Sequence, residues 1–145
     1  MADSGAEAQR SLESELGRIL GDLRSLSGEI DAGYVVSGEG RLLASTMEGT
    51  GVDLERLGAM ISALSGLSGR RARERGHEGY SQTRVRAVEG YVLLTSLSGG
   101  STLAAATGPE ARVGLVLYDM RNARPEAERA LSEVNGESSE GGSVG

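Results

Sequence analysis

The sequence predicts a single α/β domain of the α+β type, in which one five-stranded antiparallel sheet carries helices on both faces in the order α-β-β-α-β-β-β-α. The length of 145 residues suits one domain. Short apolar runs joined by glycine-containing turns predict strands that pair with their neighbours. Longer segments with apolar residues at a helical period lie before, between and after these strands. Helices packed on an antiparallel sheet satisfy all three observations.

The first helix is predicted over Glu7–Leu26, where six apolar residues recur at helical spacing: Leu12, Leu16, Ile19, Leu20, Leu23 and Leu26. Residues 1–6 are expected to be disordered. Next, Tyr34–Val36 and Arg41–Thr46 flank the turn Ser37-Gly38-Glu39-Gly40, which predicts a β-hairpin.

The second helix follows Asp53, a residue type that caps helix N-termini. Its bulky face, expected to cover the sheet, carries Leu54, Leu57, Met60, Ile61, Leu64 and Leu67. The other face carries only small residues: Gly58, Ser62, Ser65, Gly66 and Gly69, with Ala59 and Ala63 beside them. Such a face lets a second backbone approach near the short end of the ~8–10 Å helix-packing range. A partner subunit is one source of that backbone, a loop of the same chain is another, and neutral drift in a Gly-rich and Ala-rich sequence is a third.

Three further strands are predicted over Tyr80–Val88, Tyr91–Leu97 and Thr102–Thr107, joined by turns into an antiparallel meander. Beyond Gly108-Pro109, apolar residues recur at helical spacing from Val113 onwards and favour a third helix, while their β-branched content leaves a strand as the alternative.

Pro125 is expected to interrupt or kink the third helix, because proline lacks the backbone N–H that a helix interior needs. One more short helical piece is predicted over Glu126–Val134. The Ser/Gly/Glu-rich segment Asn135–Gly145 is expected to be a disordered acidic tail, so the domain spans residues 7–134.

Composition excludes several classes of protein. The absence of cysteine excludes disulfides and thiolate chemistry. No run approaches the ~20 apolar residues that span a bilayer, and the N-terminus lacks the features of a signal peptide. We therefore expect a cytoplasmic protein without membrane insertion. Because Phe and Trp are absent, the core must be a thin aliphatic one, to which a shared interface would add burial.

Charge is distributed unevenly along the chain. The net charge is −6, but residues 1–31 and 126–145 each carry −4, and the middle carries +2. All fifteen basic residues are arginine. Four tyrosines without basic–aromatic alternation offer no platform on which bases could stack, so no nucleic-acid partner is expected.

Known catalytic motifs are missing. His77 is the single histidine, and no Gly-x-Ser-x-Gly elbow accompanies it. His77-Glu78 alone does not make a metal site. Gly38-Glu39-Gly40 lacks the third glycine of a dinucleotide loop and precedes a strand. Since the chain has no lysine, a P-loop is excluded. We expect no catalytic, cofactor-binding or metal-binding residues.

Four segments together resemble the Roadblock family, named for dynein light chains, over about Leu12 to Arg121. They are the hairpin Tyr34–Ser45, the helix start Asp53–Met60, the strand start Glu89–Leu94 and the helix start Val113–Val116. The most similar branch is the bacterial one, encoded beside small Ras-like GTPases and including regulators of MglB type. This chain departs from the family in its short first strand and its Arg-rich strand from Tyr80.

The resemblance implies a profilin-like or longin-like fold and a homodimer. In such a dimer the second helices of two subunits pack together, and the third strands pair edge to edge. We accordingly expect the dimer interface to contain Gly58, Ala59, Ser62, Ser65, Gly66, Gly69, Tyr80, Gln82, Arg84 and Arg86. Partner docking is expected at Ala63, Arg70 and Arg73 on the same helices.

The function that the resemblance implies is non-enzymatic. A dimeric module would bind a small Ras-like GTPase and modulate its GTP hydrolysis or location by favouring one switch conformation, which requires different affinities for the two states. The arginines from Arg70 to Arg75 are a solvated helix end or a contact for an acidic partner; an arginine finger is a third, weaker alternative. The alternative functions are a structural scaffold that bridges proteins and, more weakly, a domain that senses a small molecule.

Overall fold

One antiparallel sheet organises the chain in the computed structural model, which describes residues 2–46, 58–61, 63–64 and 81–143. The elements are α1 (Ala2–Leu26), β1 (Ile30–Val36), β2 (Leu42–Ser45), β3 (Gln82–Ala87), β4 (Gly90–Ser96), the 3-10 turn η1 (Ser98–Gly100), β5 (Thr102–Thr107) and α3 (Val113–Ser143). Residues 58–61 and 63–64 are helical and belong to the predicted second helix.

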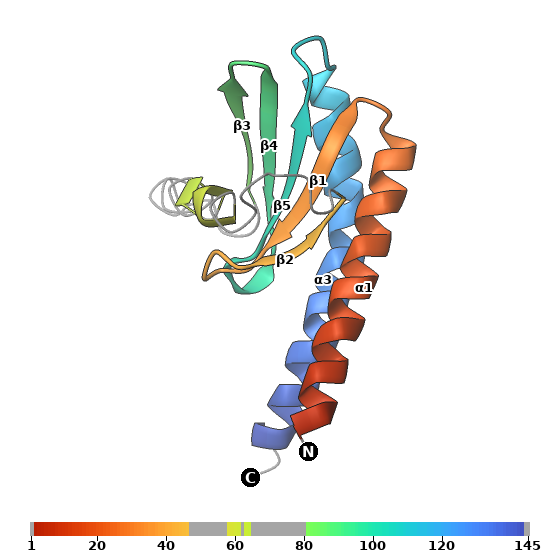
Figure 1. Cartoon of the computed structure of the whole chain (residues 1–145), viewed down its shortest axis with the longest axis vertical. Helices are drawn as coiled ribbons and strands as arrows, with labels where there is room; N and C mark the ends of the chain where they lie inside the picture. Colours follow the sequence, from red (N-terminus) through yellow and green to blue (C-terminus); the bar gives the residue numbers. More distant parts are fainter. Residues whose placement is uncertain (1, 47–57, 62, 65–80, 144–145) are drawn as a thin grey trace.

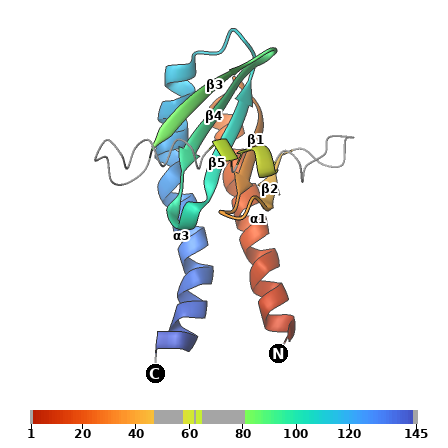
Figure 2. The ribbon, with the colours of Figure 1, turned by 90° about the vertical axis from the view of Figure 1, so that its left-hand side faces the viewer.

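The strand order is β2-β1-β5-β4-β3, and every neighbouring pair is antiparallel. Figures 1 and 2 show α1 and α3 side by side on one face of the sheet and the helical residues 58–61 and 63–64 on the other. This arrangement confirms the predicted five-stranded antiparallel sheet with helices on both faces. It also confirms the predicted meander, because β4 pairs with both β3 and β5.

The core lies on both sides of the sheet. On the side of α1 and α3, the fully buried side chains include Leu16, Val35, Leu93, Leu103 and Met120. On the opposite side, a smaller cluster joins Ile61 to the sheet residues Ala32, Tyr34, Val36, Leu94 and Ala104. Successive side chains of one strand therefore enter different clusters. A central strand buried on both faces has an almost continuous apolar sequence, as β5 does.

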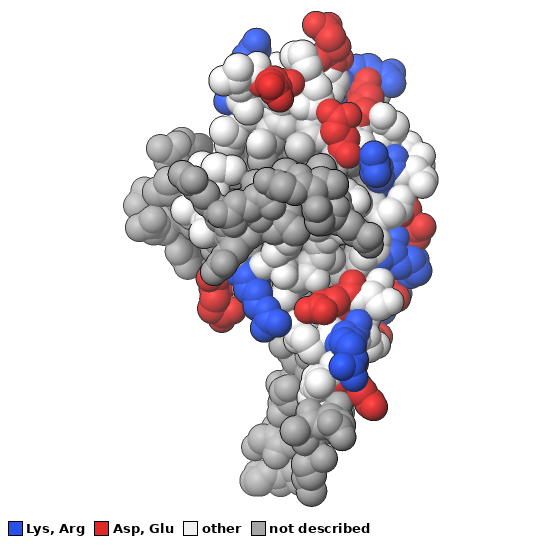
Figure 3. Space-filling view, in the orientation of Figure 1, with Lys and Arg blue, Asp and Glu red and all other residues white. Residues whose placement is uncertain are grey.

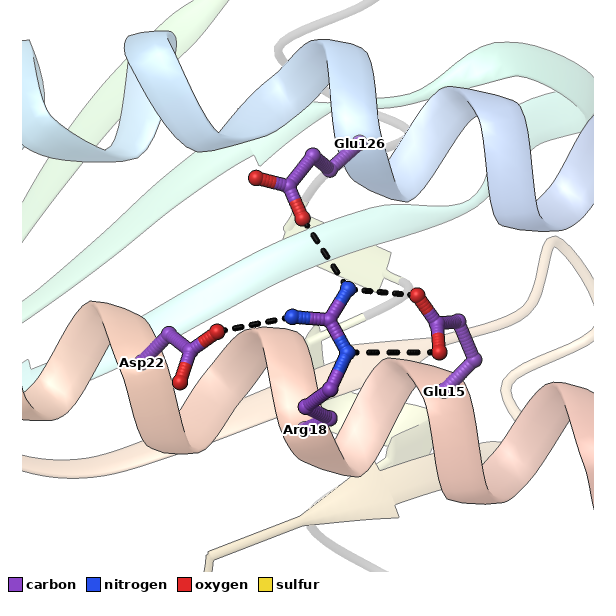
Figure 4. Close-up of polar contacts among 4 residues, drawn as sticks. All are labelled: Glu15, Arg18, Asp22 and Glu126. Atoms are coloured by element: carbon purple, nitrogen blue, oxygen red, sulfur yellow. Dashed lines mark hydrogen bonds and ion pairs between the residues drawn. The ribbon is translucent and has the colours of Figure 1, made fainter.

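The two long helices are also joined by an ion-pair cluster (Figure 4). Arg18 of α1 contacts Glu15 and Asp22 on its own helix, the latter at 2.8 Å, and Glu126 of α3 at 3.1 Å. The hydrogen bond from Arg18 lowers the pKa of the Glu15 carboxyl. The four side chains are about half exposed or more, so these ion pairs add little to the free energy of unfolding. Their main role is to orient α1 and α3 relative to each other.

Both helices are longer than predicted. α1 begins at Ala2 and α3 continues to Ser143, so both helices extend into the segments, residues 1–6 and 135–145, for which disorder is predicted. In Figure 1 the two helices extend together beyond the sheet. Extending an existing helix needs no new nucleation, so residues with weak helical propensity can follow a well-packed segment.

The predicted interruption at Pro125 is also wrong, since α3 runs through this residue without a break. Pro125 is exposed, and so is Arg121, whose carbonyl loses its usual helical partner. Water can satisfy that carbonyl, and the packed residues on either side of the proline hold the helix in place.

The first strand also differs from its predicted bounds. β1 begins at Ile30 rather than Tyr34. Its first residues are not predicted to be a strand because Asp31 and Gly33 interrupt the apolar sequence. Gly33 pairs with Ala105 of β5. A Cβ atom on Gly33 would lie 3.2 Å from Leu20 Cδ2, so this glycine gives α1 its close approach to the sheet. β3 is shorter than predicted, and β5 has its predicted bounds.

Glu29 caps the start of α3. Its two carboxylate oxygens accept hydrogen bonds of 3.0 Å from the backbone N–H and from Nε of Arg112. The side-chain hydrogen bond of Arg112, followed by its backbone N–H, lowers the pKa of the Glu29 carboxyl. A carboxylate at a helix N-terminus also interacts favourably with the positive end of the helix dipole.

We expect this cap to stabilise the protein above the ordinary carboxyl pKa of 4.5 and to be lost as the pH falls through the lower pKa of the folded state. Glu29→Gln should therefore reduce stability at neutral pH and flatten the fall of the free energy of unfolding between about pH 5 and pH 3. Urea unfolding across this range measures both effects. Glu110→Gln is the control, because Glu110 is exposed and has no ion pair among the described residues. An unchanged pH slope in Glu29→Gln would contradict the cap.

Candidate protein interface

The helical residues 58–61 and 63–64 lie with one side on the sheet and the other side open. Ile61 is fully buried against the sheet, and Leu64 packs partly onto the same cluster. Ala59 and Ala63 are exposed, and Met60 is 49 % exposed although the sequence places it on the bulky face. The described part of this helix therefore has a seated side and a small, uncharged, open side, which includes two of the residues predicted to lie in an interface.

Gly58 is a correction to the predicted dimer interface. It is buried, and a Cβ atom there would lie 2.6 Å from the carbonyl oxygen of Gly40 and 3.5 Å from the backbone nitrogen of Leu42. The close backbone approach at Gly58 is therefore made by the turn between β1 and β2 of the same chain. At Gly58 the second backbone is therefore a loop of the same chain, which is one of the three alternatives given by the sequence.

Gly58→Ala is expected to destabilise the protein by about 1–3 kcal/mol, because the added methyl group meets backbone atoms that cannot rotate away. Urea unfolding measures the difference. Gly17→Ala is the matched control: Gly17 lies in α1, and a Cβ atom there has no neighbour within 4 Å. The control should gain about 0.5–1 kcal/mol from its higher helix propensity. Equal stabilisation of both variants would show that Gly40 does not crowd Gly58.

β3 forms one edge of the sheet and pairs only with β4 among the described residues. Its other edge presents backbone groups that a second strand can pair with. Arg84 and Arg86 are exposed on β3. The guanidinium group of Arg86 lies 5.7 Å from the ring centroid of Tyr91 and donates a 3.3 Å hydrogen bond to the tyrosine hydroxyl. Charged side chains on an edge strand also disfavour pairing with unrelated strands.

The side chain of Gln82, a residue predicted to lie in the dimer interface, is engaged within its own chain. Its Nε2 donates to Thr95 Oγ1 at 3.1 Å and to the backbone carbonyl of Leu117 in α3 at 2.8 Å. Gln82 therefore links β3 to β4 and to α3, and only its backbone remains for pairing at the sheet edge. The sequence contains no local signal for this link, because its partners lie 13 and 35 residues away.

Several predicted interface residues lie outside the described residues: Ser62, Ser65, Gly66, Gly69, Arg70, Arg73 and Tyr80. Their roles stay predictions.

Other kinds of site were searched for in the same ranges. Within residues 2–46, 58–61, 63–64 and 81–143, no group of three or more acidic or histidine side chains is arranged to hold a metal ion. No helix in that part of the chain is long and apolar enough to cross a membrane. Figure 3 shows acidic and basic side chains interspersed along the face that carries α1.

Comparison with known proteins was made at three levels. The family model of the Roadblock/LC7 domain matches residues 18–107, from the middle of α1 to the end of β5. An uncharacterised protein of Methanocaldococcus jannaschii is 32 % identical over 112 residues, which cover 77 % of this chain and 92 % of the relative.

Among solved structures, MglB from Myxococcus xanthus is 14 % identical, with a TM-score of 0.72 and coverage of 84 % of this chain and 91 % of that chain. A Roadblock/LC7 domain from Streptomyces avermitilis is 28 % identical, with a TM-score of 0.57 and coverage of 77 % and 96 %. The first likeness shows a shared fold, and the family model covers more than half of the chain. This chain therefore belongs to the Roadblock/LC7 family.

Proposed function

We propose that this protein is a homodimeric regulatory module that binds a small Ras-like GTPase and changes the GTP hydrolysis or the location of that GTPase. The observation that carries the proposal is the helical segment of residues 58–61 and 63–64, which packs on the sheet through Ile61 and leaves an uncharged side exposed. Membership of the Roadblock/LC7 family and the resemblance to the MglB-type branch support it. The module itself would supply no catalytic residue.

The open side of this helix suits a second copy of the chain. Ala59 and Ala63 stand one turn apart on the helix and are both exposed. Small side chains let two helices approach closely, and the half-exposed Met60 would then be covered. Pairing along the free edge of β3 would continue the sheet from one copy into the other. Both contacts add apolar burial and hydrogen bonds that one short chain lacks.

The GTPase would then dock on the surface that the paired helices form together. Ala63 lies on this surface, and the predicted docking residues Arg70 and Arg73 follow it in the sequence. Arginines there favour an acidic partner. Regulation requires that the module bind one nucleotide state of the GTPase more tightly than the other, because equal affinity shifts no equilibrium.

The test uses the full chain and a small Ras-like GTPase of the same organism, sought first among the products of neighbouring genes. We expect the protein to bind one form of the GTPase, GDP-loaded or GTPγS-loaded, at least about tenfold more tightly than the other. We also expect it to change the rate of single-turnover GTP hydrolysis. Binding without any change in turnover or in nucleotide preference favours the scaffold alternative. Absence of binding to both forms contradicts GTPase regulation, and a ligand-dependent rise in melting temperature would favour a sensor of small molecules.

A further inference from the structure

A groove between α1 and α3 lies on the side of the sheet opposite to the helix of residues 58–64 (Figures 1 and 2). Its volume is about 140 Å³. The apolar part consists of Ile19, Leu23 and Leu26 of α1 and Ala123 of α3. The polar part consists of Asp22, Asp119, Asn122 and Glu126. Every charged residue that lines the groove is therefore acidic.

Two exposed leucines lie on the helices that form this groove: Leu26 lines it, and Leu115 precedes its lining residues on α3. Leu26 is 71 % exposed although the sequence places it in the apolar stripe of α1. Leu115 is 51 % exposed and lies one helical turn before Asp119, on the same face of α3. Exposed apolar surface rimmed by polar residues is typical of a protein interaction site.

The acidic rim is only partly neutralised within the chain. Arg18 forms ion pairs with Asp22 and Glu126, as Figure 4 shows. Asp119 has no ion pair among the described residues, and it lies between the two exposed leucines and the Arg18 cluster along α3. The groove therefore keeps a net negative charge next to exposed apolar surface.

We propose that this groove binds a basic amphipathic helix of a partner protein. Its α1 wall, Ile19–Leu26, is about two helical turns long, so a helix can lie along it with its apolar side chains against the exposed Leu26. Arginine or lysine beside this apolar stripe would pair with Asp119. A second copy of the chain fits poorly, because residues 1–31 and 126–145 each carry a net charge of −4 and the like helices of two copies would repel each other.

The test measures binding of a labelled synthetic helix to the full-length protein by fluorescence anisotropy. The probe is an amphipathic peptide of about 14 residues with a leucine stripe flanked by arginines, and the comparison peptide has glutamates in place of the arginines. We expect the arginine peptide to bind and the glutamate peptide to bind at least about tenfold more weakly. Binding of the arginine peptide should weaken as the salt concentration rises, because the paired charges are near the surface.

Matched variants test whether the peptide binds in the groove. Leu26→Ser should weaken binding of the arginine peptide about tenfold through lost apolar contact, and Asp119→Arg should weaken it about fivefold or more. Val88→Ser and Glu89→Arg are the controls, because these residues are exposed in the turn between β3 and β4, away from the groove. Thermal unfolding checks that all four variants remain folded.

Three results would overturn the proposal. One is absence of binding by the arginine peptide, and another is equal weakening in the groove variants and the controls. The third is a change in the molecular mass of the protein itself in Leu26→Ser or Asp119→Arg, since this would identify a second copy as the occupant. These measurements involve no nucleotide or GTPase, so their outcome is independent of the proposed function.

Discussion

Gly90→Ala is expected to destabilise the protein by about 4 kcal/mol or more, a large share of the about 5–15 kcal/mol that stabilises a typical domain. A Cβ atom on Gly90 would lie 1.8 Å from the carbonyl oxygen of Thr107 and within 2.9 Å of carbonyl carbons of Thr107 and Gly108. All three atoms are backbone, so no side-chain rotation relieves the overlap. Loss of the cooperative urea transition, or a large fall in its midpoint, measures the effect.

The position of Gly90 in the sheet explains why this substitution has so large an effect. Gly90 opens β4 where this strand begins to pair with β5, and the next residue, Tyr91, is paired with Thr107. Moving the two strands apart would break the central ladder that also carries the buried Leu93 and Ala105. Gly108→Ala is the matched control, since a Cβ atom on Gly108 has no neighbour within 4 Å. Similar unfolding midpoints for the two variants would rule out the steric explanation.

The double substitution Ala59→Arg with Ala63→Arg is expected to convert a dimer into a monomer. Both residues are exposed in the single chain, so the fold of one copy should tolerate arginine at each position. In the proposed dimer Ala59 would meet the partner helix, with Ala63 one turn away at the edge of that contact, and unpaired charges cost about 3–5 kcal/mol when buried. That cost corresponds to a rise of at least about a hundredfold in the dissociation constant.

Light scattering measures this second effect as a molecular mass reduced by half. The double variant Gly21→Arg with Ser25→Arg is the control, because it adds the same two charges four residues apart on the exposed part of α1. The control should keep the dimer mass, and circular dichroism should show equal helix content in both variants. A dimer mass that persists in Ala59→Arg with Ala63→Arg would exclude this helix from the interface.

Much of the fold could be predicted from the sequence because the relevant signals are local. Glycine-containing turns separate short apolar runs, and short connections place consecutive strands side by side. β5 has its predicted bounds because both of its faces are buried and its apolar residues are therefore continuous. The predictions were less accurate where a residue acts through a distant partner. The predicted strand begins only at Tyr34, whereas the observed strand includes Gly33, whose lack of a side chain lets Leu20 of α1 pack closely against the sheet.

The candidate site was predicted less completely, and Gly58 and Ala59 show why. Both are small residues of the same helix, so the sequence treats them alike. In the structure Gly58 lies against the carbonyl of Gly40, whereas Ala59 is exposed. Helical periodicity states which residues share a face, but it does not state what covers that face.

The sequence alone determined the order of helices and strands, their antiparallel pairing and the absence of cysteine and P-loop chemistry, because these follow from residue type and local spacing. Tertiary structure decided which side chains remain available to a partner. Gln82 is engaged by Leu117, and Leu26 is left exposed beside α3. The physical reason is that the burial of a side chain depends on contacts between segments far apart in the chain. Local sequence patterns do not predict those contacts.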